Sequence, residues 1–252
     1  MCKRKILFIT EGEIDEPKFI DKCFKKCYPN VEYEYYSYST DIHTLARLLF
    51  NDNNELDEYL DVQQVLKANE SNYQKKKILS QKYSDIILVF DFDPQTTKPE
   101  FNKISKMLCF FNDSTNNGML YINYPMMQSY RHIISYPEED NEFKDRVVSQ
   151  TNCANYKRIV NKESCFSNIN KYDFPKIMRI IGYQLKKASY ILNNTYAIPS
   201  PKSFETLDLN RIYKLQCQKN RNEHCIYVLN TFVFNLIEYN PKKVIENIKK
   251  YE

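Results

Sequence analysis

Two short apolar runs, each followed directly by acidic residues, place the strongest constraint on how this chain folds. Residues 6–10 (ILFIT) are followed by Glu11, and residues 86–90 (IILVF) are followed by Asp91 and Asp93. Short runs rich in β-branched and aromatic residues are typical of strands buried in a parallel sheet. Ligands of such sheets bind beside the carboxyl ends of the strands. The sequence therefore predicts that carboxylates from both runs meet in one small volume.

Carboxylates that lie close together repel one another and need a compensating cation, and their hard oxygens suit Mg²⁺ or Mn²⁺. We expect Glu11, Asp91 and Asp93 to hold this metal and to act as the catalytic residues. The two aspartates lie two positions apart, so they project from the same side of a strand. Asp15 and Glu16 are expected to assist, through a second cation or a metal-bound water. Such a metal polarises a phosphodiester and activates water. The alternative is that Asp91 and Asp93 only cap a strand end.

The spacing along the first half predicts alternating strands and helices. Strands are expected at residues 6–10, 31–38, 86–90 and 119–123. Helices are expected to begin near Asp15, Asp41 and Pro99, with Asp41 as an N-cap. This succession predicts an α/β fold with a parallel sheet flanked by helices. The polar residues 51–83 are interpreted as a helical insertion before the central strand.

The pattern changes after residue 125, which predicts a second region. We place the boundary in the loop around residues 137–140. Residues 1–136 form the predicted catalytic domain, and residues 137–252 form a basic, mostly helical C-terminal region. Helices are expected there at residues 155–160, 174–192, 204–217 and 227–239.

Charge is divided unevenly between the two parts of the chain. Residues 1–150 hold 19 Lys and Arg against 24 Asp and Glu, and residues 151–252 hold 17 against 8. A basic half is suited to a polyanion such as nucleic acid. The alternative is an ordinary solvated surface. The candidate phosphate ligands are Lys157, Arg158, Lys186, Lys187, Lys219 and Arg221.

Composition predicts a cytoplasmic protein outside the membrane. No apolar stretch approaches the ~20 residues of a membrane span. The basic N-terminus leads into an apolar run that meets Glu11 after five residues, too short for a signal-peptide core. The eight cysteines are scattered without a CxxC motif, so we expect reduced, mostly structural thiols.

The strand followed by Glu11-Gly12, and the later strand followed by Asp91-Phe92-Asp93, resemble the Toprim domain of topoisomerases, primases and overcoming-lysogenization-defect nucleases. The fuller run at residues 11–17 (EGEIDEP) and the segment at residues 123–130 (NYPMMQSY) are similar to Toprim nucleases of prokaryotic anti-phage systems. The resemblance covers about residues 5–130. It implies a compact parallel α/β sheet in which Glu11, Asp91 and Asp93 bind magnesium for phosphodiester chemistry.

The resemblance implies a metal-dependent nuclease that cuts DNA or RNA as an anti-phage effector, paired with or restrained by an ATPase or sensor protein. Gln128 stands where an acidic residue is expected, and the insertion at residues 51–83 lengthens the domain. These departures leave open a degenerate Toprim module that binds nucleic acid or a partner protein without catalysis.

A competing interpretation starts from the same Asp91-Phe92-Asp93 motif. It also resembles the haloacid dehalogenase superfamily, in which the first aspartate accepts a phosphoryl group. That family has Thr or Val two residues after the second aspartate, where this chain has Gln95.

Among the histidines, His132 is a candidate for a phosphate contact, and His43 is expected on the surface or as a helix cap.

Overall fold

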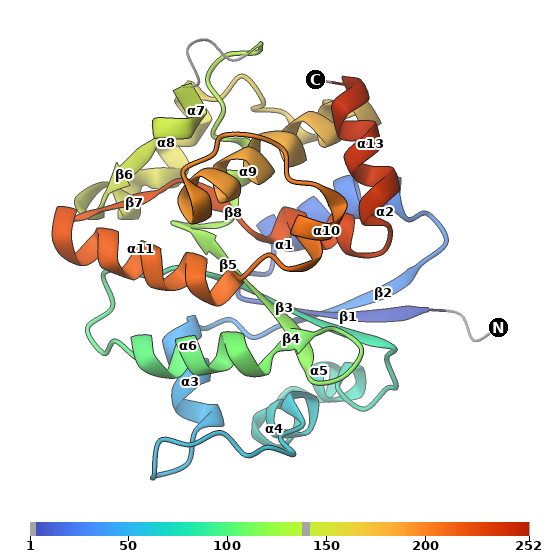
Figure 1. Cartoon of the computed structure of the whole chain (residues 1–252). Helices are drawn as coiled ribbons and strands as arrows, with labels where there is room; N and C mark the ends of the chain where they lie inside the picture. Colours follow the sequence, from blue (N-terminus) through green and yellow to red (C-terminus); the bar gives the residue numbers. More distant parts are fainter. Residues whose placement is uncertain (1–3, 138–141, 252) are drawn as a thin grey trace.

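The computed structural model describes residues 4–137 and 142–251, and its centre is a six-stranded sheet (Figure 1). The strands run in the spatial order β2-β1-β3-β5-β4, and β8 pairs with the carboxyl-terminal end of β5. Four neighbouring strands are parallel, namely β2 (Glu32–Ser37), β1 (Lys5–Thr10), β3 (Asp85–Asp91) and β5 (Gly118–Tyr124). β4 (Asn112–Asp113) and β8 (Leu229–Asn230) run antiparallel to β5. The predicted α/β class with a mostly parallel sheet is confirmed.

The central strands are buried on both faces, which explains why they are continuous apolar runs rather than alternating ones. In β1 the four residues from Ile6 to Ile9 have no exposed surface, and in β3 the same holds from Ile87 to Phe90. The register places Thr10 opposite Val89. Both strands therefore end at the same edge of the sheet, and the acidic residues that follow them begin there.

Helices cover both faces of the sheet (Figure 1). One layer holds the helices α3 (Ile42–Leu49), α4 (Val62–Asn69), α5 (Tyr73–Ile78) and α6 (Phe101–Phe110). The predicted N-cap is confirmed, because the Asp41 carboxylate accepts a hydrogen bond from the Thr44 N–H at 2.9 Å. The predicted insertion contains the short helices α4 and α5 with a polar outer surface.

The second layer begins with one helical segment that changes its winding. It comprises α1 (Asp15–Phe19), the π-helical turn η1 (Ile20–Phe24) and α2 (Lys25–Cys27). Three of its side chains are buried, namely Phe19, Ile20 and Phe24. The acidic residues at its start are thereby fixed against the end of β1.

The C-terminal region supplies the rest of the second layer and its edges (Figure 1). Its elements are α7 (Glu142–Asp145), β6 (Val147–Ser149), η3 (Gln150–Asn155), α8 (Tyr156–Glu163), η4 (Ile169–Lys171), α9 (Phe174–Asn193), α10 (Pro201–Glu205), α11 (Leu209–Glu223), β7 (Cys225–Tyr227), η5 (Phe232–Phe234), α12 (Asn235–Glu238) and α13 (Pro241–Tyr251). A short turn, η2 (Met127–Arg131), connects β5 to this region. The single helix predicted at residues 204–217 is wrong in detail, because α10 ends at Glu205 and Asp208 caps the separate helix α11. The helix predicted at residues 227–239 is wrong at its start, because Tyr227 ends β7 and Leu229 begins β8.

The two predicted regions share one hydrophobic core. β8 extends the sheet beside β5, and the Thr231 hydroxyl donates to the Ile122 carbonyl at 2.8 Å. The ring of Phe232 lies 6.0 Å from that of Phe8 in the central strand β1. The expected boundary loop lies partly outside the described residues. The C-terminal region is thus packed directly on the sheet that carries the acidic residues.

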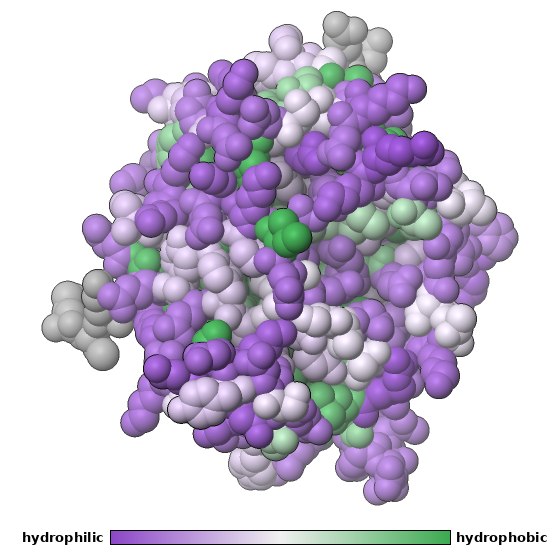
Figure 2. Space-filling model, turned by 180° about the vertical axis from the view of Figure 1, so that it is seen from behind, coloured by the Kyte–Doolittle hydropathy of each residue, from purple (hydrophilic) through white to green (hydrophobic). Residues whose placement is uncertain are grey.

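The back face of the molecule is mostly hydrophilic, and apolar side chains appear on it only as small separate spots (Figure 2). In the part of the chain that the structure describes, no helix combines the length and apolarity needed to cross a membrane. The seven cysteines within the described ranges are free thiols.

Candidate functional site

Glu11 and Asp91 meet at the carboxyl ends of two adjacent parallel strands. The main-chain N–H of Glu11 donates to the Val89 carbonyl at 3.0 Å, which continues the pairing of β1 with β3. The Glu11 carboxylate then reaches across and accepts a hydrogen bond from the Asp91 N–H, also at 3.0 Å. Glu11 and Asp91, which follow the two apolar runs, therefore lie together as predicted.

A cavity of about 330 Å³ opens at this edge of the sheet. Its polar lining is dominated by carboxylates, which come from the end of β1, the start of α1 and the end of β3. The lining residues are Glu11, Gly12, Glu13, Ile14, Asp15, Glu16, Asp91, Met126, Met127, Gln128 and Lys157. We call this the acidic cavity. Five carboxyl groups therefore share this cavity with a single lysine.

Burial disfavours the charged forms of three carboxyl groups in the acidic cavity. Burial and the neighbouring acids raise the pKa of Glu11 to about 8. Burial also raises the pKa of Glu16 and lifts that of Asp91 well above its usual range, and the charge of Glu11 adds to the shift of Asp91. Asp91 Oδ1 is sealed from solvent and has no hydrogen-bond partner among the residues that the structure describes. These carboxylates therefore lack enough positive charge and enough donors within the protein.

Gly12 allows Glu16 to turn back into the cavity. A Cβ atom at Gly12 would lie 2.8 Å from Glu16 Oε2, closer than real Cβ contacts allow. Hydrogen bonds from the main chain at Gly12 and Glu16 stabilise the ionised form of this carboxylate, against the larger effect of burial. The glycine that follows the first strand is thus required for the position of Glu16.

We expect Gly12→Ala to push the Glu16 carboxylate out of its place and to weaken the binding of Mn²⁺ at the acidic cavity about 10-fold or more, because misplaced ligands weaken a metal site. The cost in the free energy of unfolding should stay below about 1 kcal/mol, because the displaced atom is the far end of a flexible side chain. Gly182→Ala is the matched control, since its Cβ would lie 2.9 Å from the Ile248 side chain, far from the cavity residues in sequence. Urea denaturation and calorimetric titration of Mn²⁺ into both variants test this. Equal losses of Mn²⁺ affinity in the two would contradict it.

Asp15 is already paired with two polar side chains. Its Oδ2 accepts hydrogen bonds from Lys157 Nζ at 2.5 Å and from Gln128 Nε2 at 2.7 Å. Gln128 thus presents its amide nitrogen to Asp15, where an acidic residue was expected from the resemblance. Asp15 links α1 to η2 and α8, and a cation would have to compete with Lys157 for it.

Asp93 does not line the acidic cavity. Its Oδ1 accepts a hydrogen bond from the Gln95 N–H at 3.2 Å, which forms a turn after β3. Its charge nevertheless contributes to the raised pKa of Glu11, so the two carboxylates are electrostatic neighbours. Phe92 between the two aspartates is buried, as their alternation requires.

His43 is a buried structural residue, and the surface prediction for it is wrong. Its Nε2 is 3.2 Å from the Asp93 carbonyl, and its Nδ1 accepts a hydrogen bond from the Glu100 N–H at 2.9 Å. With Nδ1 accepting, Nε2 carries the proton and donates to Asp93. His43 therefore fixes the loop that follows β3.

A second cavity adjoins the first on the side of β2. It has a volume of about 620 Å³ and is lined by Glu11, Gly12, Glu13, Ser39, Thr40 and Asp41. Lys75 of α5 reaches its rim, where Lys75 Nζ lies 3.5 Å from Glu13 Oε1 and donates to the Ser37 carbonyl at 2.8 Å. Lys75 and Lys157 thus flank the acidic residues from two sides. Sequence reasoning missed Lys75, because it lies in the polar insertion and its pairing arises only from the tertiary fold.

Lys187 is not a phosphate ligand, and the prediction for it is wrong. It has no exposed surface, and its Nζ donates to the carbonyls of Phe143, Lys144 and Arg146. The pattern of adjacent lysines predicted a surface pair, but only one side of α9 faces solvent. Lys187 instead stabilises the segment around α7.

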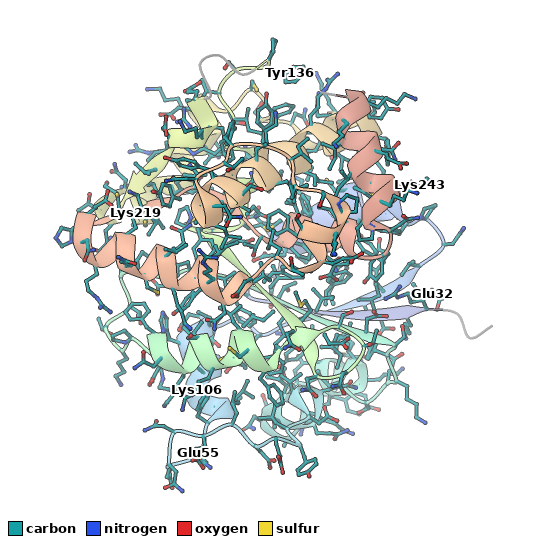
Figure 3. The ribbon with its side chains drawn as sticks, viewed as in Figure 1. Glu32, Glu55, Lys106, Tyr136, Lys219 and Lys243 are labelled. Carbon is teal, nitrogen blue, oxygen red and sulfur yellow. The ribbon has the colours of Figure 1, made fainter. Side chains whose placement is uncertain are left out.

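The other predicted basic residues do not form one patch. Lys219 is paired with Glu223 at 2.6 Å and lies over the Tyr227 ring at 4.4 Å. Arg158 and Arg221 are exposed on α8 and α11, and Lys186 is half-buried over aromatic rings of α9 and the following loop. Lys243 of α13, a further exposed basic residue of the C-terminal region, lies at the opposite side of the molecule from Lys219 (Figure 3). Of the predicted set, Lys157 lies in the acidic cavity.

His132 is also buried rather than poised at a phosphate. Its Nδ1 lies 2.9 Å from the Tyr156 hydroxyl, and its Nε2 lies 3.1 Å from a Glu163 oxygen. Burial lowers its pKa, which favours the neutral ring. His132 therefore belongs to the packing of η2 against α8.

The donor atoms of the acidic cavity fit Mg²⁺ or Mn²⁺ in their chemistry. They are hard carboxylate oxygens, and one of them, Asp91 Oδ1, is buried with no hydrogen-bond partner in the described part of the chain. Within residues 4–137 and 142–251, no three His, Cys, Asp or Glu side chains already form a group able to hold a metal ion. Coordination would therefore require these side chains to rotate toward a common centre. Glu11, Glu16 and Asp91 are the residues placed to do so.

Comparisons of the chain with protein-family models, with curated proteins and with solved structures give no match.

Proposed function

We propose that this chain is an Mg²⁺- or Mn²⁺-dependent nuclease that hydrolyses phosphodiester bonds in DNA or RNA. The observation that carries the proposal is the meeting of three buried carboxyl groups in one cavity, Glu11 and Asp91 from the ends of two adjacent parallel strands and Glu16 from α1. Buried carboxylates of this kind are unfavourable in the free protein, and a divalent cation would compensate them.

Glu11 and Asp91 would be the principal metal ligands, with Glu16 from α1 beside them. Asp93 would act from the open side, since its charge already influences Glu11. A bound divalent metal supplies Lewis-acid activation of the phosphodiester and of water. The main-chain hydrogen bond from Asp91 to Glu11 would keep the two strand ends in register while the metal binds.

The substrate would approach between Lys75 and Lys157. Both lysines are held at the site by acidic residues, Lys75 by Glu13 and Lys157 by Asp15. A phosphate is a better partner for a lysine than an exposed carboxylate when a nearby metal neutralises that carboxylate. Ile14, with 72% of its surface exposed beside the cavity, offers an apolar contact to a sugar or base.

The wider role rests on the resemblance to Toprim nucleases. It suggests an anti-phage effector in the cytoplasm that is paired with or restrained by an ATPase or sensor protein. The close packing of the C-terminal region on the sheet supports a single unit in which a partner would contact the outer helices.

A non-catalytic module that binds nucleic acid or a partner protein is the second candidate. It is favoured by the pairing of Asp15 with both Lys157 and Gln128, which resembles a closed structural network more than an open ligand set. Such a module would bind nucleic acid without cutting it.

A cleavage assay separates the two candidates. Single- and double-stranded DNA and RNA are incubated with the full chain in Mg²⁺, Mn²⁺ or EDTA. The nuclease proposal predicts cleavage with one or both metals and none in EDTA. Intact nucleic acid in every condition, together with binding that weakens as salt rises, would instead support the binding module.

The raised pKa of Glu11 also predicts how stability depends on pH. Its value is about 8 in the folded chain against 4.5 ordinarily, so the folded state holds an extra proton between these values. The free energy of unfolding without metal should therefore fall as pH rises from 6.5 to 8.5, by up to about 1.4 kcal/mol per unit. The buried His43 and His132, whose pKa values are lowered, act in the opposite direction near pH 6.5, so the fall is measured at the upper end of this window. Urea denaturation in EDTA measures it.

Two comparisons test the assignment of this pH dependence. Glu11→Gln should reduce the fall while leaving the contributions of Asp91, Glu16 and Glu238, whose pKa values are also raised. Mn²⁺ should stabilise the wild type more at pH 8 than at pH 6, because at pH 8 fewer protons compete with the metal for the carboxylates. An equal stabilisation at both pH values would argue against carboxylate ligands.

A further inference from the structure

Two helices flank the acidic cavity along the edge of the sheet where the parallel strands end. α5 lies on the side of β2, since Lys75 Nζ donates to the carbonyl of Ser37, the last residue of β2, at 2.8 Å. α8 lies on the side of β5, since Lys157 shares the Asp15 carboxylate with Gln128 of the turn that follows β5. β2 and β5 are three strand spacings apart, about 14 Å. Cations therefore border the acidic cavity on two sides.

Each of these two helices carries further cations that the fold does not use. They are Lys76 and Lys77 on α5, and Arg158 and Lys162 on α8. Lys76 is half-buried, and the other three are exposed. Within residues 4–137 and 142–251, no side chain of the four is in an ion pair or a hydrogen bond. We call them the four free cations, and they are available to the phosphates of a nucleic acid.

α5 also exposes an aromatic ring beside its free cations. Tyr73 is the first residue of α5 and has 76% of its surface exposed. Lys76 and Lys77 follow it by three and four positions, so the three side chains lie on one face of the helix. A ring of this kind stacks on an unpaired base while neighbouring lysines bind phosphates of the same strand. In a duplex the base faces are already stacked and only the base edges are accessible. The surface of α5 therefore favours a single strand.

We propose that α5 and α8 hold a single-stranded nucleic acid across the acidic cavity, with phosphates on the four free cations and one base stacked on Tyr73. The strand would follow the edge of the sheet from the side of β2 to the side of β5 and pass over Glu11 and Asp91. The inference rests on the proposed nuclease function and adds the class of substrate and its path. It also gives a role to the polar insertion at residues 51–83, because α5 belongs to it.

Binding is measured separately from cleavage. Fluorescently labelled oligo(dT) and oligo(U) of about 12 nucleotides, and a DNA duplex of the same length, are titrated with the full chain in EDTA and followed by anisotropy. At about 50 mM KCl we expect a Kd of about 1–10 μM for at least one single strand, and at least about 10-fold weaker binding of the duplex. Four phosphate contacts predict a slope of about −3 for log affinity against log salt. Absence of single-strand binding, or equal binding of the duplex, would overturn the proposal.

Two double variants test whether the strand contacts both helices. Lys76→Gln with Lys77→Gln removes the free cations of α5, and Arg158→Gln with Lys162→Gln removes those of α8. Each should weaken single-strand binding at least about 5-fold and reduce the salt slope by about 1.4, because two phosphate contacts are lost. An unchanged slope in either double variant would contradict a strand that spans the cavity.

Lys242→Gln with Lys243→Gln is the matched control for these changes. Both residues are exposed on α13, which begins shortly after Tyr239, and Arg4 at the start of β1 lies 3.8 Å over the Tyr239 ring. Lys243 lies on the same side of the molecule as Glu32, the first residue of β2 (Figure 3). This pair is therefore at the opposite edge of the sheet from the acidic cavity. It should bind single strands as the wild type does.

Tyr73→Ala tests the stacked base. It should weaken single-strand binding at least about 5-fold and leave the salt slope unchanged, because stacking releases no counterions. Tyr59→Ala is the matched control, since Tyr59 is 85% exposed in the same insertion but follows the acidic Glu58. Equal effects at both tyrosines would contradict stacking on Tyr73.

The binding and cleavage assays fail separately. Single-strand binding that depends on the four free cations, with no cleavage in Mg²⁺ or Mn²⁺, would refute the nuclease and leave this surface in place. Cleavage by a chain whose binding is unchanged in both double variants would refute the surface and leave the nuclease.

Discussion

Replacing Asp91 by asparagine is expected to lower the rate of metal-dependent phosphodiester cleavage by at least about 10³-fold. Asp91 provides the acidic cavity with a buried oxygen that has no hydrogen-bond partner within residues 4–137 and 142–251. Asparagine replaces one anionic oxygen by an amide that binds a hard cation weakly. The side-chain volume is almost unchanged, so the loss would be chemical rather than steric. Single-turnover cleavage at saturating Mn²⁺ measures it.

The same substitution separates function from stability. Because the pKa of Asp91 is raised by burial and by the charge of Glu11, a neutral side chain should leave the free energy of unfolding unchanged or increase it. Asp113→Asn, an exposed change on β4 outside the lining of the acidic cavity, is the matched control and should keep full cleavage. If folded Asp91→Asn retained more than about a tenth of the wild-type rate, the catalytic role of this carboxylate would be refuted.

Lys187→Met should destabilise the protein by about 3–5 kcal/mol, the largest effect on stability that we predict. Lys187 Nζ donates to three main-chain carbonyls, with distances of 3.0 Å to Phe143 and 2.9 Å to Arg146. Methionine fills a similar volume but leaves these carbonyls without their donor in a buried place. Urea denaturation followed by circular dichroism gives the free energy of unfolding.

Lys186→Met is the matched control for this effect. Lys186 is the preceding residue of α9, is half-buried and lies 6.0 Å from the rings of Tyr183 and Tyr196. Its replacement should cost less than about 1 kcal/mol. Similar costs at both positions would contradict the structural role that the hydrogen bonds assign to Lys187.

The sheet could be predicted from the sequence because buried parallel strands leave a local signal. Residues 6–10 and 86–90 are almost entirely apolar, and both lie within strands of the observed sheet. The N-cap at Asp41 has a similarly local cause, a carboxylate that accepts a main-chain N–H three residues on. Such features depend on neighbours in the sequence alone.

Features that depend on distant partners could not be predicted in the same way. The short strand β8 exists because residues 229–230 pair with the end of β5, about a hundred residues earlier. Lys187 and His43 are residue types that usually lie at the surface, and only the packing of other segments buries them. Polar residues satisfied by main-chain groups from far along the chain carry no mark in the sequence.

The acidic site shows the same division. The convergence of Glu11 and Asp91 follows from two strand ends in a parallel sheet and was predictable. The pairing of Asp15 with Lys157 and the approach of Lys75 to Glu13 depend on how α8 and α5 pack. Asn123, beside Asp91 in the sheet, also favours the ionised form of that carboxylate. Its position directly at the end of a strand is a signal that sequence reasoning could have used.

Calorimetric titration of Mn²⁺ into the metal-free chain tests the central claim most directly, because it needs no substrate and no partner. The account predicts saturable binding at pH 8 with a Kd in the range of about 10–100 μM, weakened at least about 10-fold in both Glu11→Gln and Asp91→Asn. Absence of binding in the folded wild type, or equal binding in the wild type and both variants, would show that these carboxylates hold no metal.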